Sequence, residues 1–252
     1  MTTDVVTRLR AAGCVFAEDE ARLLGEAASS PAELAELVDR RVAGEPLEYV
    51  LGWAEFHGLR LYLEPGVFVP RHRTEFLADQ AVALARPGAV VVDLCCGCGA
   101  VGAAIAAAVP VELHAADVSP AAVRAARRNV PRVYEGDLFT PLPAELRGRV
   151  EVLVANVPYV PTDAIDLMPP EARDHEPRAA LDGGADGLNV LRRVASAAGE
   201  WLAPGGHLLV EASRRQAPTA VSVMAGAGLD AWAVSAEGEE ATAVIGRVRV
   251  AG

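Results

Sequence analysis

The sequence predicts an α/β protein with a doubly wound parallel sheet, preceded by a small helical domain. From residue 75 onward, apolar strand-like runs alternate with Ala-rich helical runs, which is the element order of such a sheet. Hydrophobic residues make up 52% of the 252 residues and aromatic residues only 5%. This composition favours buried parallel strands and close-packed helices over an aromatic-rich sandwich.

The N-terminal part predicts two short amphipathic helices, at residues 4–26 and 31–43. The second begins at Ser30-Pro31-Ala32-Glu33, with Pro at the first helical position. Between residues 49 and 70 the pattern changes to Gly, aromatic and β-branched residues, which predicts a hairpin. We therefore expect a helical domain over 1–45, a hairpin and connector over 46–74, and an α/β domain over 75–252.

The α/β domain is predicted to begin with a helix at about residues 74–85, followed by a buried strand at 90–94. Further strands are predicted at 111–116 and 150–155, and the strand between them is expected to end near Asp137. The last stretch has two strand-like runs joined by acidic turn residues, so we expect an antiparallel hairpin at one edge of the sheet.

Charge and leader patterns narrow the classes of function. The net charge of -11 would repel a phosphate backbone, which lowers the odds of a nucleic-acid substrate. The first residues lack a basic start with an apolar core, and no apolar run approaches the roughly 20 residues of a membrane span. We expect a cytoplasmic protein.

A glycine-rich turn after the strand at 90–94 predicts a ligand site. Asp93 lies in the strand just before the turn, and Gly97 and Gly99 let the backbone approach a ligand before a helix begins. Asp117, at the end of the next strand, can accept hydrogen bonds from both ribose hydroxyls. Because Gly102 also fits the G-x-G-x-x-G spacing, these residues alone do not choose between a nicotinamide dinucleotide and another ribose-bearing cofactor.

Two residues after the third strand fit an adenine ring. The carboxylate of Asp137 could accept a hydrogen bond from the adenine amine, while Leu138 covers the ring face. An Asp that only caps the loop is the simpler interpretation of the same residue.

The turn Asn156-Val157-Pro158-Tyr159 directly follows the strand at 150–155 and predicts a site for a planar NH2 group. The Asn156 side chain can accept one N–H, the Val157 carbonyl can accept the other, and the Tyr159 ring can stack on the flat group. Pro158 holds Val157 extended and so fixes its carbonyl. An isolated N-x-P-Y would be an ordinary turn, but its place at the carboxyl edge of the sheet favours a site.

Taken together, these motifs resemble the HemK/PrmC family of protein-(glutamine-N5) methyltransferases along nearly the full chain. The segments that carry the resemblance are 46–52, 64–75, 93–100, 117–120, 136–139, 156–159, 173–178 and 181–188.

The resemblance implies a Rossmann-like, seven-stranded methyltransferase domain over 75–252 whose cofactor is S-adenosylmethionine. By resemblance, Cys95, Cys96, Gly97, Cys98 and Gly99 face the methionine part of the cofactor. Asp117 would bind the ribose, Leu138 the adenine, and Asn156 both cofactor and substrate amide. The helical domain would help to hold a protein substrate, usually a peptide-chain release factor with a Gly-Gly-Gln loop.

The chain departs from the family pattern at three places. Val157 replaces the first proline of N-P-P-Y, Cys95 replaces the first glycine of D-L-G-x-G-x-G, and His72-Arg73 replaces Pro-x in P-R-P-x-T-E. These differences predict a related subfamily with a substrate of its own.

Two other functions compete with this interpretation. An N-methyltransferase of an exocyclic base amine would use a similar turn. A non-catalytic metal or redox module could use Cys95 and Cys98, whose spacing is C-x-x-C, but no second Cys or His cluster follows, and we expect no metal. Asp174, Glu176 and Arg178 are expected to form local ion pairs in a loop beside the site.

Overall fold

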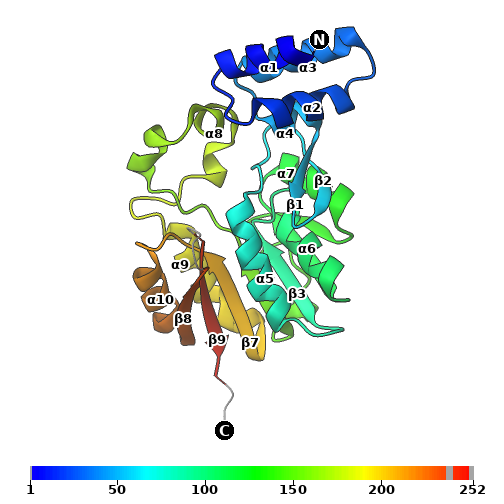
Figure 1. Cartoon of the computed structure of the whole chain (residues 1–252). Coiled ribbons are helices and arrows are strands. Elements are labelled where there is room, and N and C mark those ends of the chain that lie inside the picture. Colours follow the sequence, from blue (N-terminus) through cyan, green and yellow to red (C-terminus); the bar gives the residue numbers. More distant parts are fainter. Residues whose placement is uncertain (1, 237–240, 250–252) are drawn as a thin grey trace.

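The computed structural model describes residues 2–236 and 241–249 and contains a seven-stranded sheet, a two-stranded sheet and an N-terminal group of helices (Figure 1). The α-helices are α1 (Thr2–Ala11), α2 (Ala17–Ala27), α3 (Pro31–Val42), α4 (Leu47–Leu51), α5 (Glu75–Leu84), α6 (Ala100–Ala108), α7 (Pro120–Asn129), α8 (Pro170–His175), α9 (Asn189–Trp201) and α10 (Ala217–Gly226). The strands are β1 (Trp53–Phe56), β2 (Leu59–Tyr62), β3 (Val90–Leu94), β4 (Glu112–Asp117), β5 (Val133–Glu135), β6 (Val150–Ala155), β7 (Leu202–Glu211), β8 (Leu229–Ser235) and β9 (Thr242–Val248). Short 3-10 helices are η1 (His72–Thr74), η2 (Ala144–Leu146), η3 (Thr162–Leu167) and η4 (Arg178–Ala180).

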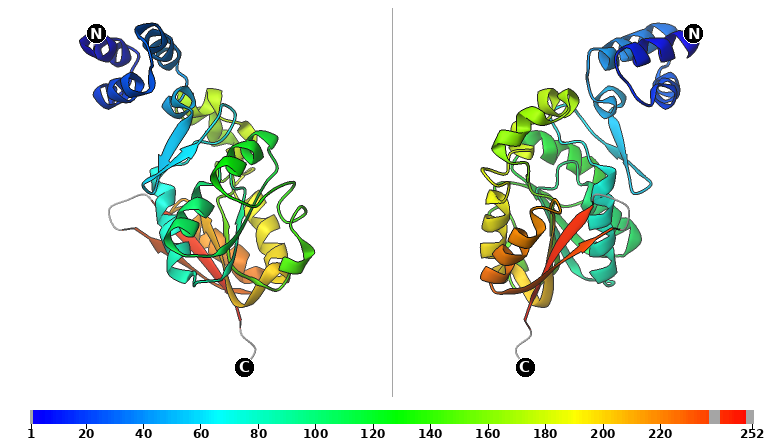
Figure 2. Two further views of the ribbon diagram at one scale, coloured as in Figure 1. Left: turned by 90° about the vertical axis from the view of Figure 1, so that its right-hand side faces the viewer. Right: turned by 60° about the vertical axis from the view of Figure 1, so that its left-hand side comes forward.

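The N-terminal helices have a hydrophobic core of their own. Leu9, Leu24 and Val38, from α1, α2 and α3, are buried against one another and against Val50 of α4. Figure 2 shows this group at one end of the molecule, with α4 and the hairpin β1–β2 leading from it to the rest. The predicted start of α3 is confirmed, because Ser30 is its N-cap and accepts a hydrogen bond from the Glu33 N–H at 3.2 Å.

The predicted helix over 4–26 was wrong, because two helices occupy that segment. Gly13 adopts a left-handed conformation with φ of 93° and ends α1. The Cys14 N–H donates to the Leu9 carbonyl and the Gly13 N–H to that of Arg10, which is the Schellman pattern of helix termination. A glycine just beyond an apolar repeat was the signal in the sequence.

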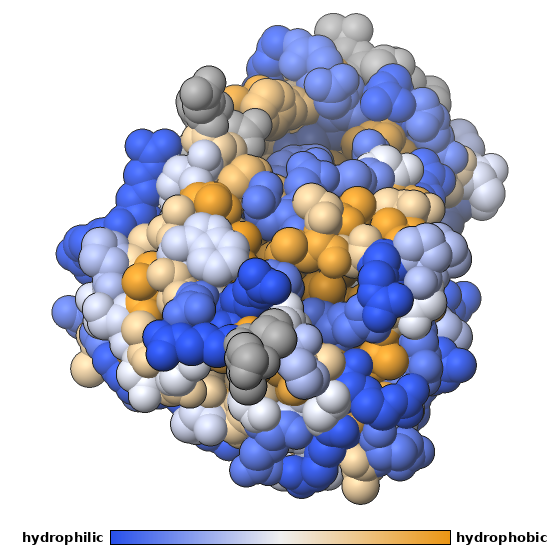
Figure 3. Space-filling view, turned by 90° about the horizontal axis from the view of Figure 1, so that it is seen from below, coloured by the Kyte–Doolittle hydropathy of each residue, from blue (hydrophilic) through white to orange (hydrophobic). Residues whose placement is uncertain are grey.

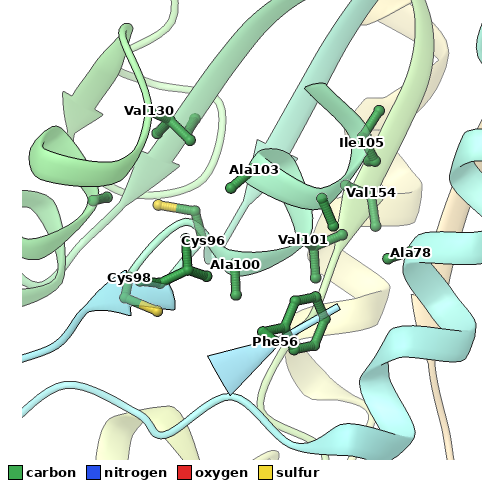
Figure 4. Packing of buried hydrophobic residues seen from close by; sticks show 14 of the residues in the cluster. Phe56, Ala78, Cys96, Cys98, Ala100, Val101, Ala103, Ile105, Val130 and Val154 are labelled. Carbon is green, nitrogen blue, oxygen red and sulfur yellow. The ribbon is translucent and has the colours of Figure 1, made fainter. Parts of the chain in front are cut away.

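The hairpin β1–β2 packs onto the large domain and shares its core. Phe56 of β1 is fully buried and lies beside Ala100 and Val101 of α6 (Figure 4). Within the described residues, one hydrophobic cluster therefore extends from the connector into the α/β domain, and the N-terminal helices form a separate cluster. The three-part domain division stays a prediction.

The large sheet has the strand order β5-β4-β3-β6-β7-β9-β8. The first five strands in this order, from β5 to β7, are parallel to one another, while β9 is antiparallel to both of its neighbours, β7 and β8. The predicted doubly wound sheet and edge hairpin are therefore confirmed; the acidic residues 237–240 lie outside the described residues. The chain order reverses between β3 and β6, and ligands bind at such a switch point, outside the carboxyl ends of the strands.

Helices cover both faces of this sheet. Along β3, Val91 belongs to the cluster with α5, α6 and α7, while Val90 and Val92 belong to the cluster with α9 and α10. This alternation follows from the two-residue period of a strand and explains why all five residues of β3 are buried.

Figure 3 shows the face seen from below Figure 1, where hydrophobic residues gather near the centre of a mainly hydrophilic surface. None of the helices in the described part of the chain is long and apolar enough to cross a membrane.

Candidate active site

A cavity of about 370 Å³ lies at the carboxyl ends of β3, β4 and β6. One wall is the glycine-rich turn, from Cys95 to Cys98, and another is the acceptor turn, from Asn156 to Tyr159. Two further walls come from residues 66–73 of the connector and 177–181 near η4. The volume suits a small organic ligand, and the position is the switch point of the sheet.

The glycine-rich turn has an unusual backbone. Gly97 and Gly99 have φ of 55° and 83°, and Cys95 has φ of 55° although it is not glycine. A side chain at this φ is strained, and such strain gathers at functional sites. Cys95 therefore keeps a backbone conformation suited to the family's glycine. Gly99 caps α6 and does not line the cavity.

Asp117 lies at the end of β4 and lines the cavity. Its carboxylate accepts hydrogen bonds from the N–H groups of Gly97 and Ser119, each at 2.9 Å. These bonds link the glycine-rich turn to the strand end and fix the carboxylate. Each oxygen has a second lone pair, so acceptor capacity for a ligand hydroxyl remains.

Asp93 lies behind the turn and does not line the cavity. Its side chain is almost fully buried, with 1% exposure, and accepts a hydrogen bond from the Gly102 N–H at 2.9 Å. Burial raises the pKa of Asp93 to about 7. A Cβ at Gly102 would lie 3.0 Å from the Asp93 carboxylate, so this glycine is needed where α6 packs closely on β3.

The two residues predicted for adenine also lie outside the cavity lining. β5 ends at Glu135, two residues before Asp137, whose carboxylate accepts from Arg193 at 2.5 Å on the surface. Leu138, with φ of 50°, packs against the cluster beneath α9 and α10. The structure therefore brings the glycine-rich turn, Asp117 and the acceptor turn together, but not Asp137 or Leu138.

The acceptor turn has one free amide. Asn156 lines the cavity, and no group within residues 2–236 and 241–249 forms a hydrogen bond with its side chain. By contrast, the Val157 side chain is 3% exposed and packs into the core beneath the sheet. The residue that departs from the family pattern thus contributes mainly packing, while Asn156 keeps its donors and acceptor for a ligand.

Tyr159 is held by residues that sequence reasoning missed. Its hydroxyl donates to the Glu211 carboxylate at 2.6 Å and accepts from Arg73 Nη2 at 2.9 Å. Its carbonyl accepts from Gln216 Nε2 at 2.8 Å. Glu211 could have been found, because it is a carboxylate at the carboxyl end of an apolar strand, like Asp117; Gln216 has no comparable signal.

The expectation of local ion pairs near α8 was wrong for Glu176. Asp174 pairs with Arg173 and Arg178 with Asp182, but the Glu176 carboxylate accepts from Arg71 at 2.6 Å. Because Arg71 lines the cavity and Pro177 follows the buried Glu176, this pair joins two cavity walls. The resemblance drew attention to both segments without indicating their contact.

Cys96 and Cys98 contribute to the hydrophobic core. Figure 4 shows both side chains beside Ala100, and all four cysteines are free. Burial raises the pKa of the Cys95, Cys96 and Cys98 thiols, so they are protonated at neutral pH. Across the described ranges, no group of three His, Cys, Asp or Glu residues is arranged to hold a metal ion.

Known proteins match this chain over most of its length. The methyltransferase small domain family model matches residues 59–166. The release factor glutamine methyltransferase of Geobacter sulfurreducens is 41% identical over 209 residues, which cover 79% of this chain and 72% of that protein. The 4-amino-L-phenylalanine/4-methylamino-L-phenylalanine methyltransferase of Streptomyces pristinaespiralis is also 41% identical, over 69% of this chain and 63% of that protein.

A solved methyltransferase structure from Pyrococcus furiosus has a TM-score of 0.57 at 17% identity, covers 75% of this chain and 90% of that one, and shares the fold. The family that the motifs resemble, and the cofactor that this resemblance implies, are confirmed. The chain therefore belongs to the HemK/PrmC family of protein-(glutamine-N5) methyltransferases, whose methyl donor is S-adenosylmethionine.

Proposed function

We propose that this enzyme methylates the side-chain amide nitrogen of a glutamine in a protein, and that a peptide-chain release factor is the first substrate to test. The observation that carries the proposal is the free amide of Asn156, which shares one cavity with the glycine-rich turn and Asp117. The name of the Geobacter sulfurreducens relative supports the choice of release factor.

The cofactor fits the wall formed by the glycine-rich turn. A Cβ at Gly97 would have no atom within 4 Å, so space is open there, and Asp117 stands at the adjoining strand end. Cys95, Cys96, Gly97 and Cys98 would border the methionine part and Asp117 would accept from the ribose hydroxyls. When bound, S-adenosylmethionine supplies an electrophilic methyl group. Asp93 and Gly99 support the turn from behind.

The acceptor turn would orient the substrate amide. The NH2 group donates one hydrogen bond to the Asn156 side chain and one to the Val157 carbonyl, while the Tyr159 ring stacks on the amide plane. An amide nitrogen is a poor nucleophile because its lone pair is delocalised. Fixing both N–H groups directs that lone pair toward the methyl group, so positioning supplies much of the rate gain. Pro158 keeps the Val157 carbonyl in place.

The experiment is transfer of labelled methyl from S-adenosylmethionine to release factors carrying a Gly-Gly-Gln loop, with that glutamine replaced as the control. Label that depends on the glutamine supports the proposal. Bound cofactor without such label contradicts it, and the panel therefore includes 4-amino-L-phenylalanine, because the Streptomyces pristinaespiralis relative acts on it. RNA and DNA test the base-amine alternative, for which binding should weaken steeply with salt.

Asn156→Ala tests the role of the acceptor turn. Turnover should fall about 100-fold, because a misplaced acceptor loses the near-attack geometry, while affinity for S-adenosylmethionine changes only a few-fold. Turnover equal to that of the wild type would exclude this role for Asn156.

We also propose that the N-terminal helices help to hold the protein substrate and that the enzyme is cytoplasmic. The separate core of these helices supports the first proposal, since a unit with its own packing can present a binding surface. Removing residues 1–45 should then raise the KM for a protein substrate and leave the KM for a short Gly-Gly-Gln peptide unchanged.

A further inference from the structure

Tyr159 is fixed at both ends by residues distant in the sequence. Gln216 Nε2 holds its carbonyl at 2.8 Å, and Glu211 and Arg73 hold its hydroxyl at 2.6 and 2.9 Å. A tyrosine ring that only filled a cavity wall would need neither anchor. Both anchors together set the position and the plane of the ring.

Glu211 is the centre of the hydroxyl anchor. Its side chain is 5% exposed and accepts hydrogen bonds from the Tyr159 hydroxyl, from Thr74 Oγ1 at 2.5 Å and from Arg73 Nε at 3.1 Å. A buried carboxylate persists only when donors compensate for its lost hydration. Here one donor from the acceptor turn and two from η1 converge on it, so it ties the acceptor turn to η1, directly before α5.

We infer that Glu211 is a positioning residue for methyl transfer, which acts by holding the Tyr159 ring against the acceptor group. Glu211 does not itself line the cavity, whereas Tyr159 and Arg73 do. The effect of Glu211 on an acceptor must therefore pass through these two side chains. The glycine-rich turn is hydrogen-bonded to Asp117 instead, so cofactor affinity should not depend on Glu211. The inference rests on the proposed use of Tyr159 as the acceptor wall.

The test is a double-mutant cycle with Glu211→Gln, Tyr159→Phe and the double variant. Glu211→Gln keeps the side-chain shape but removes the charge and one acceptor. We expect kcat to fall about 10-fold in each single variant, with an unchanged dissociation constant for S-adenosylmethionine. The double variant should be no slower than the slower single variant, because both substitutions break the same anchor.

The control is a second hydroxyl network, centred on the buried His114, in which Tyr134 and Glu112 are half-buried. Tyr134 and Glu112 both hydrogen-bond to His114, at 3.0 Å each, and none of the three lines the cavity. Tyr134→Phe and Glu112→Gln should therefore leave kcat unchanged. A fall in kcat in these controls comparable to that in the test variants would mean that loss of any such network slows the enzyme, and would overturn the inference.

The cycle is measured with whichever acceptor the substrate panel identifies, so absence of glutamine methylation refutes the proposed function without deciding this inference. A second cycle, in the free energy of unfolding, measures the same coupling without an acceptor. Multiplicative losses of kcat, an unchanged kcat in Glu211→Gln, or no coupling in unfolding would each overturn the inference.

Discussion

Gly187 provides a sharp test of how the acceptor turn is supported, although it lies outside the cavity. It has φ of 77°, and a Cβ built on it would lie 2.2 Å from the Tyr159 carbonyl oxygen and 2.3 Å from Gln216 Nε2. The first contact can be relieved only by a shift of the backbone, and the second requires the Gln216 side chain to move. Gly187→Ala should therefore disturb the turn from behind.

The expected cost follows from two terms. A non-glycine residue in the left-handed region costs about 1–2 kcal/mol. If Gln216 leaves, its hydrogen bonds to the carbonyls of Tyr159 and Asp186 are lost, at about 1 kcal/mol each. The sum is about 3–4 kcal/mol, which for a chain of this size lowers Tm by roughly 10 °C.

Denaturant unfolding and methyl transfer measure the two consequences. Gly199→Ala is the matched control, because Gly199 lies in α9 with no atom within 4 Å of a built Cβ. Alanine should stabilise that helix by about 0.5–1 kcal/mol. Gly187→Ala should also lower kcat more than cofactor affinity. A loss below about 1 kcal/mol with normal turnover would refute the proposed support of the turn.

Three further predictions concern other parts of the molecule. Because the pKa of Asp93 is raised to about 7, the folded state holds a proton that the unfolded state has released, so its contribution to stability falls as pH rises from about 4 to 7. The gain in unfolding free energy from Asp93→Asn, measured without cofactor, should grow across that window and level off above it. Asp117→Asn should weaken S-adenosylmethionine binding roughly 10-fold in calorimetry, since a charged acceptor of hydroxyl hydrogen bonds becomes neutral. Arg41→Ala should cost about 3–5 kcal/mol in denaturant unfolding, because it leaves the buried Glu20 carboxylate without its partner at 2.7 Å, whereas loss of the exposed Arg22–Glu26 pair should be nearly neutral.

The fold could be predicted from the sequence wherever the signal is local. The strand at 150–155 and the helix start at Ser30 were placed correctly, since both depend on patterns within a few residues. The missed break at Gly13 was also local, but the apolar residues that follow the glycine, at 14–17, concealed it. The order of strands in the sheet depends on long-range pairing, which no local pattern indicates.

The site residues, like the fold, could be predicted where the signal is local. Residues at strand ends, such as Asp117 and Asn156, reach the cavity because parallel strands bring their carboxyl ends to one edge. Asp137 and Leu138 follow the short edge strand β5 by two and three residues, where strand position no longer determines where a side chain points. The Arg71–Glu176 pair spans 105 residues, and no local pattern could have indicated it.

The residues that support the acceptor turn explain why the four-residue motif by itself is only a weak indicator of a binding site. Asn156 can present a free amide only because the chain around it is held elsewhere: Gln216 and Gly187 position the Tyr159 carbonyl, and Glu211 positions its hydroxyl. These three supports come from residues later in the chain than the turn, and Arg73, which also holds the hydroxyl, comes from before it. The replacement at Val157 leaves all of these contacts intact, because its side chain faces the core. Substrate preference of this enzyme should therefore depend more on the walls that include Arg71 and Arg73 than on the replaced proline.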